Sequence, residues 1–261
     1  MIRSYLESVG LAAEGFSGWA AAQPVLRGTE PWRAAAATPY VPQLLPANER
    51  RRATPAILQA FRASEDALAL SARDLTQLAT VFASADAEMA VLNRICTALS
   101  RSPRLVSPTD FHNSVHNAAS GYFGIAIRSM MPATTVAAYD HSFAAGLLEA
   151  ATLVMTEQCA ALLVAYDVMA PAPLSAARPL AASASCALLL SPARSPATLA
   201  ELTVGLAEGD STPCASASLE PLRRACPVLR ALPLLELLAR GQAGTVRLAL
   251  GPARALTVAC A

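Results

Sequence analysis

The sequence has 261 residues, enough for one large domain with a well-buried core. Apolar residues make up 54% and charged residues only 15%, which predicts that a partner covers part of the surface, and the net charge of +1 favours neither nucleic acid nor a membrane surface. The longest apolar runs are interrupted by Glu149 and Asp167, so none reaches the roughly 18 residues that cross a membrane. Because Glu7 also argues against a secretory signal, we expect a cytoplasmic protein without a membrane span.

The N-terminal quarter predicts a strand, a short helix, an irregular stretch and a longer helix. Residues 2–9 are weakly patterned as a strand, residues 16–40 as a short helix followed by irregular structure, and residues 44–52 as a turn. Thr54 followed by Pro55 is typical of an N-cap and a first helical residue, so we expect a helix over 54–73. Its apolar face is formed by Ile57, Leu58, Phe61 and Leu68.

The next segment predicts a strand and two helices. Residues 77–83 form a short apolar strand, and Ser84, Asp86 and Glu88 then suit the cap and the acidic first turn of a helix that runs to Leu99. We expect five residues of this helix to face the core: Met89, Leu92, Ile95, Cys96 and Leu99. After a loop over 101–110, residues 112–128 predict a helix whose small residues allow close packing.

The C-terminal half continues the alternation. A strand over 133–139 leads into a helix over 142–157, and residues 159–168 form a continuous apolar run that fits a strand buried on both faces. After a Pro-rich loop the pattern predicts strands over 183–190 and 199–206, a helical region over 219–240 broken by its prolines, and a hairpin of 245–250 with 255–260. This order predicts an α/β protein.

The six cysteines are scattered and form no CxxC pair, which argues against a zinc site and a disulfide framework. The three histidines are His112, His116 and His141. The first two have the spacing of zinc ligands in HExxH, but the segment reads HNSVH, without the glutamate base and without an evident third ligand. We therefore expect a structural or interface role for this pair, and neither a metal nor a cofactor.

Asp140, His141 and Ser142 bring an acid, a base and a hydroxyl together at the turn before the 142–157 helix. Consecutive residues of a turn rarely point at one another, so we expect Asp140 or Ser142 to cap the helix rather than to complete a catalytic triad. The run Arg50-Arg51-Arg52 could receive an acidic carrier protein, but a solvated arginine surface beside Glu49 is the ordinary explanation and the one that we favour.

The order of these elements resembles that of the β-ketoacyl synthases of the thiolase-like superfamily, and most closely the short chain length factors of aryl polyene and xanthomonadin-type pigment clusters. The resemblance rests on five segments: LLPANERRRATP (44–55), VFASADAEM (81–89), LVSPTDFHNSVHNAASGYFGIAI (105–127), AAYDHSFAAGLLEAA (137–151) and ALLVAYDV (161–168). It implies a single thiolase-like layered α/β domain over residues 1–261, truncated in its C-terminal half.

Two departures from the synthases bear on catalysis. In the synthases a strand leads to a nucleophilic cysteine at the start of a buried helix, and the resemblance places Asp140 at or beside that position, with Ser142 on a serine of the motif. No cysteine lies between Cys96 and Cys159, and a thiolate is needed to accept an acyl chain as a thioester. No histidine follows His141, whereas the synthases place two in their C-terminal half.

The resemblance therefore implies a non-catalytic subunit. It would form a heterodimer with an active β-ketoacyl synthase, shape its acyl tunnel in aryl polyene or polyketide-type fatty acid biosynthesis, and work with an acyl carrier protein. The expected interface and tunnel residues are Phe111, His112, Asn113, His116, Asn117, Tyr139 and Phe143. Core packing explains the aromatic residues equally well. The alternative function is a thiolase-like acyl-thioester hydrolase or decarboxylase that uses Asp140 and His141.

Overall fold

Nine strands of the computed structural model, which describes residues 1–36 and 38–261, form one mixed sheet in the order β4-β3-β5-β6-β1-β7-β9-β8, with β2 paired to β1. The strands β4, β3 and β5 are parallel, and the other pairs are antiparallel. The α/β class predicted from the sequence is thus confirmed. The strands are β1 (Ile2–Ala13), β2 (Phe16–Ser17), β3 (Ala79–Ala83), β4 (Ala133–Val136), β5 (Ala161–Asp167), β6 (Ala184–Ser191), β7 (Ala200–Glu208), β8 (Gly244–Gly251) and β9 (Arg254–Cys260).

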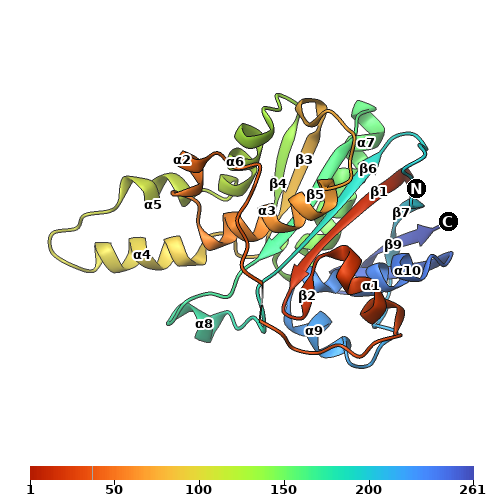
Figure 1. Ribbon diagram of the computed structural model, residues 1–261. Helices are drawn as coiled ribbons and strands as arrows, with labels where there is room; N and C mark the ends of the chain where they lie inside the picture. Colours follow the sequence, from red (N-terminus) through yellow and green to blue (C-terminus); the bar gives the residue numbers. More distant parts are fainter. Residues whose placement is uncertain (37) are drawn as a thin grey trace.

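Helices cover both faces of this sheet (Figure 1). One core cluster joins α3 and α6 to the sheet, and a second joins α7, η3 and α10 to its other face. The helices are α1 (Trp19–Arg27), α2 (Ala47–Arg50), α3 (Pro55–Leu68), α4 (Met89–Leu99), α5 (Pro108–Asn113), α6 (Ala118–Ile127), α7 (Ser142–Glu157), α8 (Leu174–Ala177), α9 (Glu220–Ala225) and α10 (Leu232–Arg240), with 3-10 turns η1 (Leu75–Gln77), η2 (Tyr139–His141) and η3 (Val228–Ala231). None of these described helices has the length and apolar character needed to cross a bilayer.

The central strand β5 explains why its sequence is continuously apolar. All seven of its residues are buried. Successive side chains of a strand point to opposite faces, so Leu162 and Val164 pack under α3 and α6 while Leu163 and Ala165 pack under α7. The predicted burial on both faces is confirmed.

A glycine sets the distance between α7 and the sheet. A Cβ atom at Gly146 would lie 2.7 Å from the Cβ of Ala83 and 2.8 Å from Cδ1 of Leu163, closer than real Cβ atoms approach other atoms. Only glycine allows the helix to lie this near to β3 and β5. The close approach fixes the start of α7 beside the carboxyl ends of the parallel strands.

Several predicted boundaries differ from the structure. Thr54 caps α3 as expected, accepting a hydrogen bond from the Ile57 N–H at 3.2 Å, but the helix ends at Leu68. The single helix predicted over 112–128 is wrong, because residues 114–117 separate α5 from α6. The hydroxyl of Ser114 donates to the carbonyl of Phe111 at 2.8 Å, the type of local bond by which polar side chains compete with a helix. The two histidines therefore do not share a helix face.

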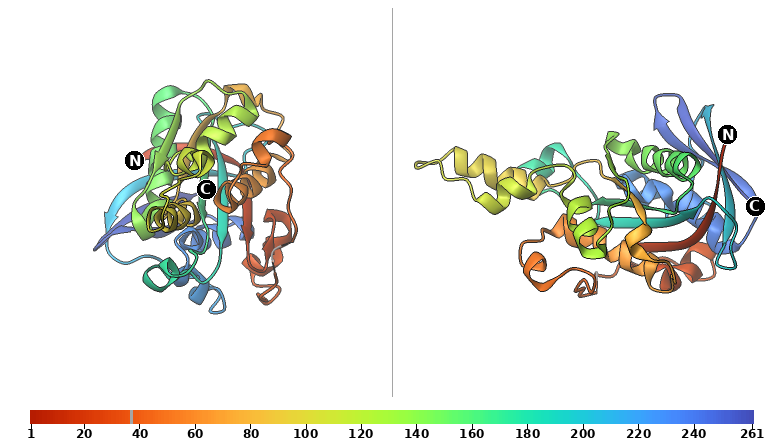
Figure 2. Two further views of the ribbon diagram at one scale, coloured as in Figure 1. Left: turned by 90° about the vertical axis from the view of Figure 1, so that its left-hand side faces the viewer. Right: turned by 90° about the horizontal axis from the view of Figure 1, so that it is seen from above.

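Residues 89–117, which contain the helices α4 and α5, extend away from the body of the protein (Figures 1 and 2). We call this segment the arm. The predicted core-facing side of α4 is wrong: Leu92, Cys96 and Leu99 are exposed, and Met89 and Ile95 are only partly buried. The reason is geometric, because the helix points away from the sheet and its apolar side has little of its own chain to pack against. The predicted side-chain cap of α4 is absent as well.

Candidate functional site

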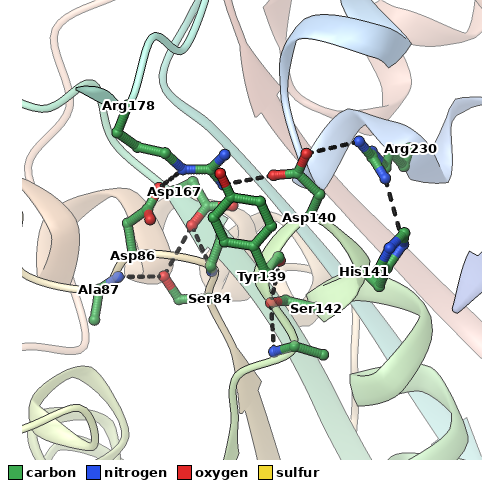
Figure 3. A network of polar contacts seen from close by, with 12 residues as sticks. Ser84, Asp86, Ala87, Tyr139, Asp140, His141, Ser142, Asp167, Arg178 and Arg230 are labelled. Carbon is green, nitrogen blue, oxygen red and sulfur yellow. Dashed lines mark hydrogen bonds and ion pairs between the residues drawn. The ribbon is translucent and has the colours of Figure 1, made fainter. Parts of the chain in front are cut away.

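The three parallel strands have their carboxyl ends at the same end of the sheet, where ligand and active sites of α/β proteins commonly form. Polar residues end or follow each strand here: Ser84 and Asp86 come after β3, Asp140 comes after β4, and Asp167 is the last residue of β5. Figure 3 shows that they converge on the turn before α7. This turn is the position at which the sequence comparison with the synthases placed Asp140.

Asp140 is held between two arginines. Its Oδ1 lies 2.6 Å from Nη2 of Arg178, and its Oδ2 accepts a hydrogen bond from Nη2 of Arg230 at 2.9 Å. Arg178 also donates through Nε to Asp86 at 2.6 Å. Burial acts to lower the pKa of Arg178, but its ion pairs with the two aspartates outweigh burial and raise it, so its positive charge is secure.

The predicted helix cap is therefore wrong for both candidates. Neither Asp140 nor Ser142 caps α7: the first is occupied by arginines, and the hydroxyl of the second closes the preceding turn. That hydroxyl donates to the carbonyl of Tyr139 at 2.7 Å and accepts from the N–H of Ala138 at 3.0 Å. Nδ1 of His141 lies 3.4 Å from Nη1 of Arg230 and does not contact Asp140 or Ser142, so the three residues form no triad.

Tyr139 has an unusual backbone and an exposed ring. Its φ of 51° lies in the left-handed region, which is rare and strained for a bulky residue. The guanidinium carbon of Arg178 lies 4.1 Å from the centre of its ring, within the range of a cation–π contact. The residue is nevertheless 61% exposed.

Two buried carboxyl groups lie near the carboxyl ends of the parallel strands. Asp167 accepts from the hydroxyl of Ser84 at 2.9 Å and from the N–H of Ala85 at 2.8 Å. Glu88 is hydrogen-bonded by the hydroxyl of Thr54. Burial raises the pKa of each carboxyl group to about 7, so both favour the protonated form more strongly than exposed acids do.

The cysteines do not have the properties of an activated nucleophile. Burial raises the pKa of five thiols, those of Cys159, Cys186, Cys214, Cys226 and Cys260. A nucleophilic thiol needs the opposite shift. The sixth, Cys96, is exposed on the arm. Within the described residues, no group of three or more His, Cys, Asp or Glu side chains could hold a metal ion.

The structure separates the predicted interface residues into exposed and buried sets. Phe111 is 71% exposed, and His112 and Asn117 are also exposed. Asn113 is buried and donates through its side chain to the carbonyl of Arg52 at 2.9 Å, which ties the arm to the arginine run. Phe143 is buried in the core cluster around α7 and does not reach the surface.

The remaining predicted residues lie around the base of the arm. His116 is half-buried in the turn between α5 and α6. Arg50 donates to the carbonyl of Pro42 at 3.1 Å, whereas Arg51 and Arg52 are exposed. Arg52 also lies 3.9 Å from a carboxylate oxygen of Glu49, so its exposed charge is partly balanced.

The sequence profile for the β-ketoacyl synthase N-terminal domain matches residues 19–234, which is most of the chain. The chain belongs to the β-ketoacyl synthase family. In this family member the turn before α7 carries Asp140, whose carboxylate contacts Arg178 and Arg230 from two other segments. No curated protein matches the chain.

Solved structures share the fold of this β-ketoacyl synthase family member at low identity. A chain of the ketosynthase ApeO in complex with its chain length factor ApeC, from Xenorhabdus doucetiae, has a TM-score of 0.75 at 20% identity, with 99% of this chain and 100% of that chain covered. A chain of the ishigamide ketosynthase/chain length factor has a TM-score of 0.74 at 13% identity, covering 100% and 99%. A chain of AntDE:AntF, a type II polyketide synthase acyl-carrier protein in complex with its ketosynthase, has a TM-score of 0.74 at 10% identity, again covering 100% and 99%.

Sequence reasoning missed Arg178, Arg230 and the two aspartates Asp86 and Asp167 as members of the site. The two aspartates could have been found from the sequence. Because β3 and β5 are parallel, the residues that end or follow these strands lie at the same end of the sheet. The arginines lie in a Pro-rich loop and in η3, where no periodic pattern indicates direction. Their partners depend on how distant segments fold together.

Proposed function

We propose that the chain is a non-catalytic subunit that forms a heterodimer with an active β-ketoacyl synthase and shapes its acyl tunnel, as a chain length factor does in aryl polyene or polyketide-type fatty acid biosynthesis. The single domain would act in the cytoplasm. The structures of similar fold that contain a ketosynthase together with a chain length factor support this assignment.

The observation that carries the proposal is an apolar surface on the arm that its own chain leaves uncovered. The exposed large apolar residues of the arm are Leu92, Leu99, Leu105, Phe111 and Val115. Monomeric proteins rarely expose such a cluster, and a partner subunit would bury it. Within the arm, Arg94 of α4 and Asp110 of α5 form an ion pair at 2.7 Å that joins the two helices.

The edge strand β4 offers a second surface to which a partner could bind. β4 is the terminal strand of the sheet on its parallel side, and its residues are only partly buried. An edge strand presents backbone donors and acceptors to which another chain can pair. The partner would therefore meet both β4 and the arm.

The chemistry of the turn supports a non-catalytic role. Both carboxylate oxygens of Asp140 lie against guanidinium groups, which opposes their use as a nucleophile on an acyl group. The sequence offers no cysteine between Cys96 and Cys159 and no histidine after His141. The hydrolase or decarboxylase alternative requires Asp140 to react, and its two ion pairs oppose this.

Co-expression with a β-ketoacyl synthase of the same organism, followed by size-exclusion chromatography and product analysis, tests the assignment. We expect a heterodimer, and we expect Phe111→Asp to abolish it. The control is Leu70→Asp, because Leu70 is 100% exposed but lies beyond the far end of α3, about 20 Å along the helix from the capped end at the arm. A chain that stays monomeric while the synthase makes the same product alone would refute the proposal.

An acyl carrier protein is a proposed second partner. Its acidic surface would suit Arg51 and Arg52, which are exposed beside the arm. Reversing both charges to Glu should weaken carrier-protein binding to the complex in a salt-dependent way, measured by titration at two ionic strengths. Unchanged binding would remove these residues from the contact.

A further inference from the structure

We infer that Asp140 is a positioning residue: held between Arg178 and Arg230, it fixes the ring of Tyr139 as a rigid wall on the surface that meets the partner synthase. Tyr139 then limits the length of the acyl chain that the pair can accommodate. This inference rests on the proposed function and assigns a specific task to Asp140, which the resemblance places at or beside the nucleophile position of active synthases.

The backbone at Tyr139 is fixed from both sides. Its left-handed φ of 51° is not one that a tyrosine adopts without compensation. The hydroxyl of Ser142 supplies part of this compensation, because it donates to the carbonyl of Tyr139 and accepts from the N–H of Ala138. The direction in which the side chain leaves the backbone is therefore set by this turn.

The ring is fixed by Arg178, and Arg178 is fixed by two acids. Its guanidinium lies against the ring at 4.1 Å, and its nitrogens contact Asp86 and Asp140, each at 2.6 Å. A guanidinium held by two carboxylates cannot swing away, so the ring keeps a flat and charged support. Figure 3 shows the ring lying across this network.

Arg230 makes the network depend on Asp140. It binds the second oxygen of that carboxylate at 2.9 Å and comes from η3, which packs on the same face of the sheet as α7 but lies 90 residues further along the chain. Asp140 thus connects the turn to two segments that are far apart in sequence. Replacing its charge would loosen Arg178, Arg230 and, through Arg178, the ring of Tyr139.

The ring faces outward although its support is buried. Tyr139 follows β4, the edge strand, and is 61% exposed, whereas the side chain of Arg178 is 11% exposed. A rigid aromatic residue loses little conformational freedom when a partner covers it and gives that surface a defined shape. Because the ring is held rigidly, it would set a fixed maximum length for an acyl chain in a cavity shared with the partner.

The test uses the complex with the partner synthase and five variants: Tyr139→Ala, Tyr139→Phe, Arg178→Met, Arg178→Lys and Asp140→Asn. Size-exclusion chromatography measures assembly, thermal unfolding measures folding, and mass spectrometry measures the product lengths. We expect Tyr139→Ala to give longer products from an intact complex. Arg178→Met, Arg178→Lys and Asp140→Asn should broaden the length distribution, because each removes part of the arrangement in which a planar guanidinium is held between two carboxylates. Tyr139→Phe should retain the distribution, because it keeps the ring.

Product length separates positioning from a merely structural role, since a structural role would change unfolding or assembly alone. An unchanged distribution from an assembled Tyr139→Ala complex would overturn the inference. So would a shift in Tyr139→Ala that neither Arg178→Met nor Asp140→Asn affects. If Asp140→Asn does not fold, Arg178→Met decides the role of the network. Failure of the wild-type chain to assemble would instead refute the proposed function.

Discussion

The raised pKa of the buried Asp167 predicts how the free energy of unfolding depends on pH. Burial raises the pKa of this carboxyl group from its ordinary 3.8 to about 7. Between pH 4 and pH 7 the folded protein therefore holds a proton that the unfolded chain releases. Stability contributed by this group is fully present below pH 4 and is lost as the pH rises through 7. A pKa difference of about 3 corresponds to about 4 kcal/mol.

Asp167→Asn removes the titration while keeping the shape. The amide oxygen can still accept from Ser84 and Ala85, as the carboxyl oxygen does. Urea unfolding of both proteins from pH 4 to pH 8 should show the wild type losing about 4 kcal/mol more than the variant across this range. Glu88 titrates over the same range in both proteins, so its contribution cancels in the difference.

Asp210→Asn is the matched control, because Asp210 is exposed and its substitution also removes one carboxylate. It should leave the pH profile parallel to that of the wild type. A profile for Asp167→Asn that is also parallel to the wild type would refute the reasoning, since the charge at this site would then carry no burial cost.

Four further outcomes follow from the structure. Gly146→Ala should lower the unfolding free energy by about 1–3 kcal/mol through overpacking, while Gly121→Ala, a helical glycine with open space around it, should raise it by up to about 1 kcal/mol; equal urea midpoints would contradict this. Thr54→Val should cost about 2 kcal/mol because it removes both a helix cap and the bond to a buried carboxyl group, and Thr54→Ser should retain most of the stability. Phe111→Asp should change the unfolding free energy of the isolated chain by less than about 0.5 kcal/mol, so a larger loss would mean that the arm packs on its own body. Asp140→Cys should not give the isolated chain condensing activity with malonyl and acyl carrier thioesters, and product formation would disprove the non-catalytic assignment.

The sequence was most informative where burial alone dictates the pattern. The run that became β5 is apolar at every position because both of its faces are covered, and the final hairpin alternates because β8 and β9 have one covered face. The break at Pro227 was also foreseen, since proline cannot continue the helix there.

The arm was misinterpreted for a physical reason. Leu92 and Leu99 repeat with helical spacing whether the surface that covers them belongs to the same chain or to another. Periodicity reports that a face is apolar, not what lies against it. The arginines around Asp140 were missed for a related reason, because ion pairs between distant segments leave no local pattern.

The terminal position of β4 has a consequence for how the protein must be made. A chain that leaves the ribosome with an open sheet edge and an uncovered apolar arm is vulnerable to aggregation until another polypeptide shields it. Under the proposed function, cells would have to synthesise this chain in step with the synthase that covers it, and surplus copies would be targets for chaperones and proteases. Balanced production of the two chains would then be a requirement of the fold itself.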